Sequence, residues 1–286
     1  MALPPLPSLT GVEHSWVQVG DVELHVAQAG DPDAPPVMLV HGWPQHWWEW
    51  RAQIPLLART HRVICPDLRG HGWSQAPRGD YRKQTLADDL VGLLDALGHD
   101  DPIGVVGHDW GGWISFLLAL SAPERVSRLL AMSIPHPWFR TRRSLQAPVF
   151  ASYQLLVSTP GLGQAVLRRA PQFVSKVLRL GVTRPEAFTA RDLELYASVL
   201  QDPDHAAATT ALYRTFLTRE SSRRGGFPEL RVPTDLVIGE DDVVLKMAEV
   251  GPHPGIELEI VPGAGHFLPE EMPELVQRRI QAMLAR

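Results

Sequence analysis

The sequence predicts an α/β fold, in which helices cover both faces of a mostly parallel sheet. Short apolar runs rich in β-branched residues recur along the chain, and longer segments with helical periodicity separate them. Some of these runs, such as residues 36–40, are continuously apolar, which is typical of a strand buried on both faces. With 286 residues, the chain is long enough for one large domain or for a core domain with an insertion.

Eight segments have the pattern of strands, and the segments between and after them have the pattern of helices. The expected strands are residues 16–19, 22–27, 36–40, 62–66, 103–106, 128–132, 234–239 and 256–261. The expected helices are residues 47–58, 85–97, 113–120 and 273–286. The first two strands alternate apolar and polar residues around Gly20-Asp21, which predicts a hairpin with one solvated face.

The alternation of strands and helices is interrupted between the sixth and seventh strands. From about Pro135 to Arg224 we find only helical periodicity, with prolines between the segments. We interpret this stretch as a helical cap inserted into the core. The chain then divides into a first part of the core at 1–134, the cap at 135–226 and a second part of the core at 227–286.

Composition and charge argue against several classes of function. The formal net charge of −5 provides no basic field for nucleic acid or for an anionic membrane surface. The single cysteine, Cys65, excludes an internal disulfide and a cysteine-rich zinc site, and no metal-ligand spacing occurs, so we expect no metal and no cofactor. Residues 1–9 lack a signal-like apolar segment, and no apolar run approaches the ~20 residues that span a bilayer. We expect a cytoplasmic protein without nucleic-acid or membrane partners; the oligomeric state is not indicated.

One reactive side chain, Asp109, lies in the turn between the fifth expected strand and the helix that follows. Residues 104–112 read Gly-Val-Val-Gly-His-Asp-Trp-Gly-Gly, so small residues flank the aspartate on both sides. Glycines at these offsets allow a sharp strand-to-helix turn that exposes the central side chain at the edge of the sheet. This is the pattern of a nucleophile elbow with aspartate in place of serine.

Two further polar residues follow the last two strands. Asp242 lies in the Gly-Glu-Asp-Asp segment that begins at Gly239, and His266 follows Gly265. The carboxyl ends of parallel strands meet at one edge of a sheet, so we expect Asp109, Asp242 and His266 to lie together. Asp241 remains an alternative to Asp242. Among the other histidines, we expect exposed side chains for His14, His25, His61, His99, His205 and His253.

These motifs, taken together, resemble those of the α/β-hydrolase superfamily, and within it the epoxide hydrolases. The matching segments are His41-Gly42-Trp43-Pro44, Asp67-x-Arg69-Gly70-His71-Gly72-x-Ser74, Gly107-His108-Asp109-Trp110-Gly111-Gly112, Gly239-x-x-Asp242 and Gly265-His266. The resemblance implies an α/β-hydrolase fold, with a mostly parallel eight-stranded sheet and a helical cap between strands 6 and 7. It also implies an aspartate nucleophile. Haloalkane and haloacid dehalogenases carry an aspartate at the same place and remain an alternative.

The chemistry of an aspartate nucleophile assigns roles to the other residues. A carboxylate is ionised at neutral pH, so Asp109 can attack saturated carbon unaided and form an alkyl-enzyme ester. Hydrolysis of that ester requires a base, His266, which Asp242 orients. The backbone N–H groups of Trp43 and Trp110 are the expected oxyanion hole.

The leaving group distinguishes an epoxide from a halide. An opening epoxide leaves an alkoxide, which needs a proton donor such as a tyrosine. Epoxide hydrolases resemble one another in carrying two tyrosines in the cap, and Tyr153 and Tyr213 match them, whereas Tyr196 has the spacing of a core residue. We therefore expect conversion of an epoxide and water to a vicinal diol; a remote alternative is a non-catalytic receptor. The expected substrate pocket consists of Trp43, Pro44, Trp110, Trp138 and Phe267.

Overall fold

The computed structural model describes residues 3–141, 147–221 and 226–286. Eight of its strands form one sheet in the order β1-β2-β4-β3-β5-β6-β8-β10. Their bounds are β1 Val12–Val19, β2 Val22–Ala29, β3 Pro36–Val40, β4 Arg62–Pro66, β5 Ile103–His108, β6 Val126–Met132, β8 Thr234–Gly239 and β10 Ile256–Val261. The predicted number and positions of these strands are confirmed.

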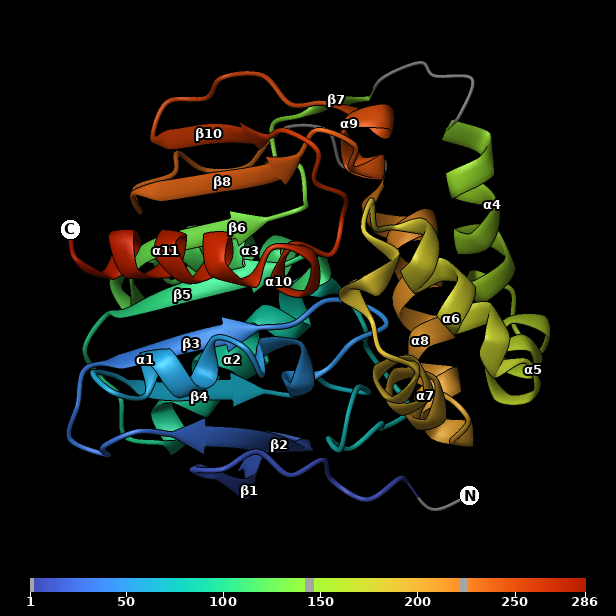
Figure 1. Ribbon diagram of the computed structural model, residues 1–286, viewed down its shortest axis with the longest axis horizontal. Helices are drawn as coiled ribbons and strands as arrows, with labels where there is room; N and C mark the ends of the chain where they lie inside the picture. The colour runs from blue at the N-terminus through green and yellow to red at the C-terminus, as the bar shows by residue number, and fades with distance from the viewer. Residues whose placement is uncertain (1–2, 142–146, 222–225) are drawn as a thin grey trace.

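The direction of the strands also follows the prediction. β1 and β2 form an antiparallel hairpin, and β2 is antiparallel to β4. From β4 to β10 every neighbouring pair is parallel. The sheet is therefore mostly parallel, and the carboxyl ends of six strands meet at one edge, which lies on the right in Figure 1.

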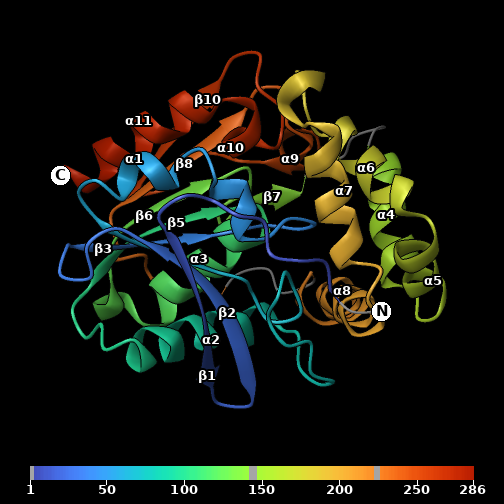
Figure 2. The ribbon, with the colours of Figure 1, turned by 60° about the horizontal axis from the view of Figure 1, so that its bottom comes forward.

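Helices cover both faces of this sheet. One face carries α1 (Ile54–Leu57) and α11 (Pro273–Leu284), and the other carries α2 (Lys83–Ala96) and α3 (Trp110–Ser121) (Figure 2). α3 is apolar and almost completely buried, as its sequence predicts. The helix expected over 47–58 is instead a 3-10 turn, η1 (Trp47–Trp50), followed by the single turn of α1. Pro55 lacks the backbone N–H that a continuous helix would use, so the second turn begins anew there.

The helices between β6 and β8 lie together beyond the carboxyl ends of the strands (Figure 1). They are α4 Ala147–Ser158, α5 Leu162–Arg169, α6 Pro171–Leu180, the 3-10 turn η3 Pro185–Ala187, α7 Ala190–Val199, α8 Pro203–Thr215 and a π-helical turn, η4, Phe216–Glu220. The expectation of helices alone is wrong in one detail. A two-residue strand, β7 (Arg140–Thr141), pairs with β9 (Ala248–Glu249), and two residues are too few to leave a periodicity in the sequence. The division into core and cap at 135 and 226 stays a prediction.

Three short elements complete the chain: η2 (Pro123–Arg125), α9 (Val243–Met247) and α10 (Leu268–Glu271). Over the described ranges, no helix has both the length and the apolar character needed to cross a membrane.

Candidate active site

Asp109 occupies the turn between β5 and α3 in a conformation that few residues adopt. Its φ is 49° and its ψ is −123°, so the backbone is in a strained region for a side chain other than glycine. The surrounding glycines make this turn possible. A Cβ on Gly42 would lie 2.5 Å from Cβ of Asp109, and one on Gly111 would lie 2.2 Å from the Val40 carbonyl oxygen. The predicted elbow therefore depends on close backbone approaches that only glycine permits.

The two carboxylate oxygens of Asp109 have different partners. Oδ2 accepts a hydrogen bond of 2.9 Å from the backbone N–H of Trp43. Oδ1 lies 3.6 Å from Nε2 of His266. The loop after β3 thus supplies one of the two amides expected to form an oxyanion hole, while the role of the Trp110 amide, at the start of α3, stays a prediction.

His266 lies between two carboxylates. Its Nδ1 is 2.9 Å from Oδ1 of Asp242, which is fully buried and also accepts a hydrogen bond of 2.9 Å from the Val244 N–H as the N-cap of α9. Asp241 is exposed, so the carboxylate that faces the imidazole is that of Asp242. The backbone N–H of His266 donates to the carbonyl of Gly181, at the end of α6, over 2.6 Å. A residue of the predicted cap therefore helps to hold the histidine.

The charges around His266 stabilise its protonated form. Burial favours the neutral ring, but the negative charge of Asp242 and the hydrogen bond with Asp109 together raise its pKa to about 10. For Asp242, burial raises the pKa and His266 lowers it, with a lowered pKa as the net result. The raised pKa therefore favours the protonated ring of His266 at neutral pH.

Tyr153 of α4 and Tyr213 of α8 come together over the same loop. The ring centroids of Trp43 and Tyr153 are 6.0 Å apart, and those of Trp43 and Tyr213 are 5.2 Å apart. Burial and the nearby charge of Asp109 raise the pKa of Tyr153 to about 12. Burial, Tyr153 and Asp109 raise the pKa of Tyr213 well above its ordinary value. Both hydroxyls therefore carry their protons at neutral pH.

The other residues predicted for the pocket are distributed unevenly. Trp110 packs against Tyr213, with ring centroids 5.8 Å apart, and Pro44 is buried in the Trp43 loop. Phe267 is 2% exposed and packs edge-on against the ring of His266. Trp138 stacks on His253 at a centroid distance of 3.9 Å. Places for all five residues in a substrate pocket stay predictions.

A buried polar network that no sequence pattern predicts lies next to the Trp43 loop. Arg51 contacts Glu270 at 2.7 Å and Asp192 of α7 at 3.2 Å, and Tyr196 donates to Glu270 over 2.7 Å. Tyr196 is thus a core residue, as its spacing predicts, with a polar partner. Arg51 belongs to the predicted α/β core and Asp192 to the predicted cap. This network therefore joins the cap helices to the core.

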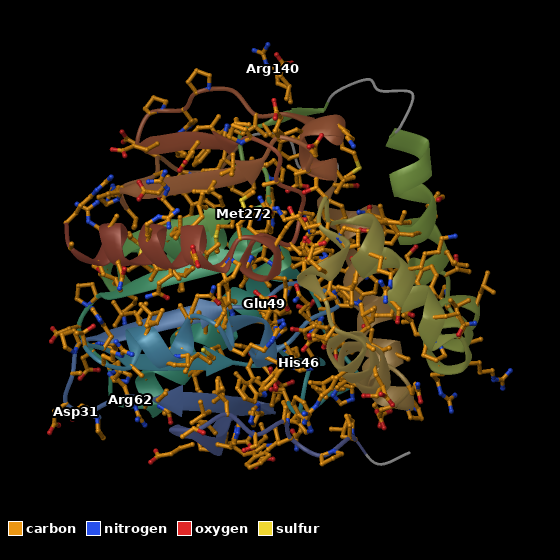
Figure 3. All side chains as sticks on the ribbon, viewed as in Figure 1. Asp31, His46, Glu49, Arg62, Arg140 and Met272 are labelled. Carbon is orange, nitrogen blue, oxygen red and sulfur yellow. The ribbon has the colours of Figure 1, made fainter. Side chains whose placement is uncertain are left out.

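A second buried pair lies behind His266. Nε2 of His108 contacts the His266 carbonyl oxygen at 2.9 Å, and its Nδ1 lies 3.5 Å from Glu49. Burial raises the pKa of Glu49 to about 7, against the effect of His108. Figure 3 shows Glu49 and His46 near the edge of the sheet that faces the α6–α8 helices. The sequence contains one indication that Glu49 is buried. It is the only charged residue in the segment Trp47-Trp48-Glu49-Trp50, whose large aromatic side chains favour burial.

Two histidines contradict the prediction of exposed side chains. His25 is fully buried and lies 2.7 Å from Asp67, and His205 is 4% exposed. The ring of His205 lies 3.0 Å from Asp202 at the start of α8. The alternating pattern around His25 could not indicate the partner of that ring. Within the described parts of the chain, no group of three or more His, Cys, Asp or Glu side chains is arranged to hold a metal ion.

Comparisons with known proteins show the family to which the chain belongs. A family model described as "alpha/beta hydrolase fold" matches residues 35–273. The AB hydrolase superfamily protein YfhM of Bacillus subtilis (strain 168) is 34% identical over 283 residues, which cover 95% of this chain and 98% of that protein. The soluble epoxide hydrolase of Corynebacterium sp. (strain C12) is 30% identical over 277 residues, covering 93% of this chain and 95% of that protein.

A solved structure adds the same result at the level of the fold. "Epoxide hydrolase CorEH without ligand" superposes with a TM-score of 0.86 at 27% identity, covering 96% of this chain and 99% of that chain. The chain belongs to the α/β-hydrolase superfamily and, within it, to the epoxide hydrolase family.

Proposed function

We propose that the protein converts an epoxide and water to a vicinal diol through a covalent ester on Asp109. The observation that carries this proposal is the position of His266, whose ring nitrogens lie 2.9 Å from Asp242 and 3.6 Å from Asp109. The imidazole of His266 can therefore accept a proton from a water molecule near Asp109, while Asp242 stabilises the positive charge of the ring. Two protonated tyrosines beside Trp43 add the proton donors that an epoxide requires.

In the first step, Oδ1 of Asp109 attacks an epoxide carbon. Oδ2 is the weaker nucleophile, because it accepts the hydrogen bond from Trp43. The carbon–oxygen bond of the ring breaks, and Tyr153 or Tyr213 gives its hydroxyl proton to the departing oxygen. The product is a hydroxyalkyl ester of Asp109, with Oδ2 as its carbonyl oxygen.

In the second step, water attacks the carbonyl carbon of that ester. Esterification removes the negative charge of Asp109, which is one of the two groups that raise the pKa of His266. The imidazolium then gives its proton to the tyrosinate left by the first step, by way of water, and the neutral ring accepts a proton from the attacking water. Oδ2 becomes the oxyanion and already has the Trp43 N–H as its donor. When this intermediate collapses, the diol oxygen leaves and takes the proton of the new hydroxyl group, which restores the Asp109 carboxylate; His266 keeps the proton that it took from water and is again an imidazolium.

The two tyrosines favour an epoxide over a halide as the leaving group. A halide departs as a stable anion and needs only N–H donors, whereas an alkoxide must be protonated as it leaves. The hydroxyls of Tyr153 and Tyr213 interact with each other across the two α-helices that carry them, and Asp109 contributes to the raised pKa of both. This charge coupling supports a place for both hydroxyls in the same site as Asp109, where they can face the departing oxygen across the substrate from the nucleophile.

The experiment is a comparison of a styrene-type epoxide with a bromoalkane, on the wild type and on Asp109→Ala and His266→Gln. Diol and bromide release are measured, and intact mass spectrometry detects the ester. We expect diol from the wild type, none from Asp109→Ala, and an adduct of the substrate's mass on His266→Gln. Bromide release without diol would support the dehalogenase alternative, and turnover of neither substrate would overturn the proposal.

A further inference from the structure

Lys83 occupies a position that is unfavourable for a cation in two respects. It is the first residue of α2, where the positive end of the helix dipole repels a cation. Its side chain is also completely buried, although lysine is almost never buried without a specific partner. Burial of the Lys83 ammonium group therefore costs free energy. The contacts of this group show which residues its charge can affect.

Three of these contacts join the start of α2 to the last turns of α8 and to η4, which follows it. Nζ donates a hydrogen bond of 2.6 Å to the carbonyl of Leu212, the residue directly before Tyr213. Nζ also lies 3.0 Å from Glu220, whose other carboxylate oxygen accepts the backbone N–H of Lys83 over 2.9 Å. A cation is favourable at the carbonyl end of a helix, so Lys83 suits α8 better than its own helix. The backbone beside Tyr213 is fixed by these contacts.

The same ammonium group contacts the residue that follows the nucleophile. Nζ lies 4.7 Å from the ring centroid of Trp110, and 5.2 Å from that of Phe216. Without water between them, a cation and an indole face attract each other strongly. The Trp110 ring also makes an edge contact with Tyr213, and a hydrogen bond from Trp110 favours ionisation of the Tyr213 hydroxyl. Lys83 thus contacts both neighbours of Tyr213 at once.

We propose that Lys83 is a positioning residue for the opening of the epoxide. Its ammonium group fixes the Leu212 carbonyl and the Trp110 ring relative to each other, and so holds the Tyr213 hydroxyl where the departing oxygen is protonated. A positive charge behind Trp110 also strengthens the indole as a hydrogen-bond donor to that hydroxyl. The inference rests on the proposed function, because it assigns Lys83 to the first of the two steps.

The charge on Lys83 changes within an accessible pH range. Burial lowers its pKa to about 8, against the opposing effect of Glu220. The opening step should therefore slow as pH rises through about 8, when the ammonium group loses its charge. Glu220→Gln removes the anion that supports this charge, so it should move the same decline to lower pH.

The test measures ester formation in a single turnover, with His266→Gln as the parent so that the ester accumulates. A styrene-type epoxide is mixed rapidly with enzyme, and intact mass spectrometry follows the adduct. We expect Lys83→Met to slow ester formation by about tenfold or more, and Lys83→Arg to recover most of the rate. The control is Lys176→Met, which removes an exposed lysine of α6 and should leave the rate unchanged.

A second comparison separates positioning from a general loss of structure. In a Tyr213→Phe background, where Tyr153 remains as a donor, Lys83→Met should cause little further loss because its effect passes through Tyr213. The proposal is overturned if Lys83→Met retains the parental rate, or if its full effect persists in the Tyr213→Phe background. If the Lys83→Met variant does not fold, the Glu220→Gln variant tests the proposal instead. The proposal is then overturned if the rate of ester formation depends on pH in the same way in Glu220→Gln as in the parent. A parent that forms no adduct with any epoxide would contradict the proposed function itself, whereas an active parent insensitive to Lys83 contradicts only this inference.

Discussion

Nε2 of His266 lies 3.6 Å from Oδ1 of Asp109, so the proposed base and the proposed nucleophile share one charge interaction before any substrate arrives. The imidazolium balances two carboxylates, and Asp242 holds it from the other side. In the proposed mechanism, this arrangement makes His266 a poor base until Asp109 has formed the ester. In that mechanism, ester formation must come first, because loss of the Asp109 charge is what lowers the pKa of His266 enough for it to act as a base.

The first prediction concerns stability and pH. The pKa of His266 is raised from its ordinary 6.5 to about 10 in the folded chain. Its protonation therefore stabilises the fold fully below about pH 6.5, and this contribution is lost as pH rises through about 10. Asp242→Asn removes the main cause. Its cost in the free energy of unfolding should be about 2 kcal/mol near neutral pH and should shrink towards pH 10. Urea unfolding at several pH values measures this, and a cost independent of pH would contradict it.

The second prediction separates the adjacent aspartates. Asp242→Asn should reduce turnover by roughly 10²–10⁴-fold, because the imidazole loses the carboxylate that orients and charges it. Asp241→Asn is the matched control, since Asp241 is exposed and should lose almost no activity. Steady-state diol formation measures both. Equal losses from the two variants would contradict the assignment of Asp242.

The third prediction concerns the proton donor. Tyr213→Phe should slow ester formation from an epoxide by roughly 10²-fold, because one hydroxyl that protonates the leaving oxygen is removed. Tyr81→Phe removes a buried hydroxyl that donates instead to the Pro77 carbonyl. It should leave ester formation intact, although it costs the fold about 1 kcal/mol. Rapid-mixing experiments compare the two; similar rates for both variants would remove Tyr213 from the mechanism.

The fourth prediction concerns the network around Arg51. Arg51→Met should lower the free energy of unfolding by about 3 kcal/mol, because it leaves the buried charges of Glu270 and Asp192 without their partner. Arg279→Met breaks an ion pair with Glu259 at the surface and should cost less than ~1 kcal/mol. Urea denaturation measures both. A loss for Arg51→Met no larger than that for Arg279→Met would show that the network contributes little.

The sequence predicted the strands well, because each has a strong local pattern. Asp109, Asp242 and His266 each follow such a strand directly, so the parallel sheet alone suggested that they meet. The break between η1 and α1 was missed, although Pro55 was visible. Contacts of Lys83 were not predictable: it bonds to a carbonyl 129 positions away, and no local pattern indicates which distant backbone group a lysine meets.

Arg51 shows the same limit. Its partners lie in α7 and α10, and one sequence carries no signal that a cation in an aromatic turn will pair with both. The burial of His25 was hidden for a related reason. Its strand alternates as a half-solvated strand does, yet Asp67, from a different loop, covers the ring.

The bond from the His266 N–H to the Gly181 carbonyl has a practical consequence for protein engineering. Shortening the protein by deleting residues 135–226 would open the nucleophile to bulky compounds, which makes such a truncation attractive. It would also remove the acceptor that fixes the backbone of the histidine, together with both tyrosines. Designs that enlarge the accepted substrates should therefore vary side chains within the inserted helices and keep the Gly181 backbone in place.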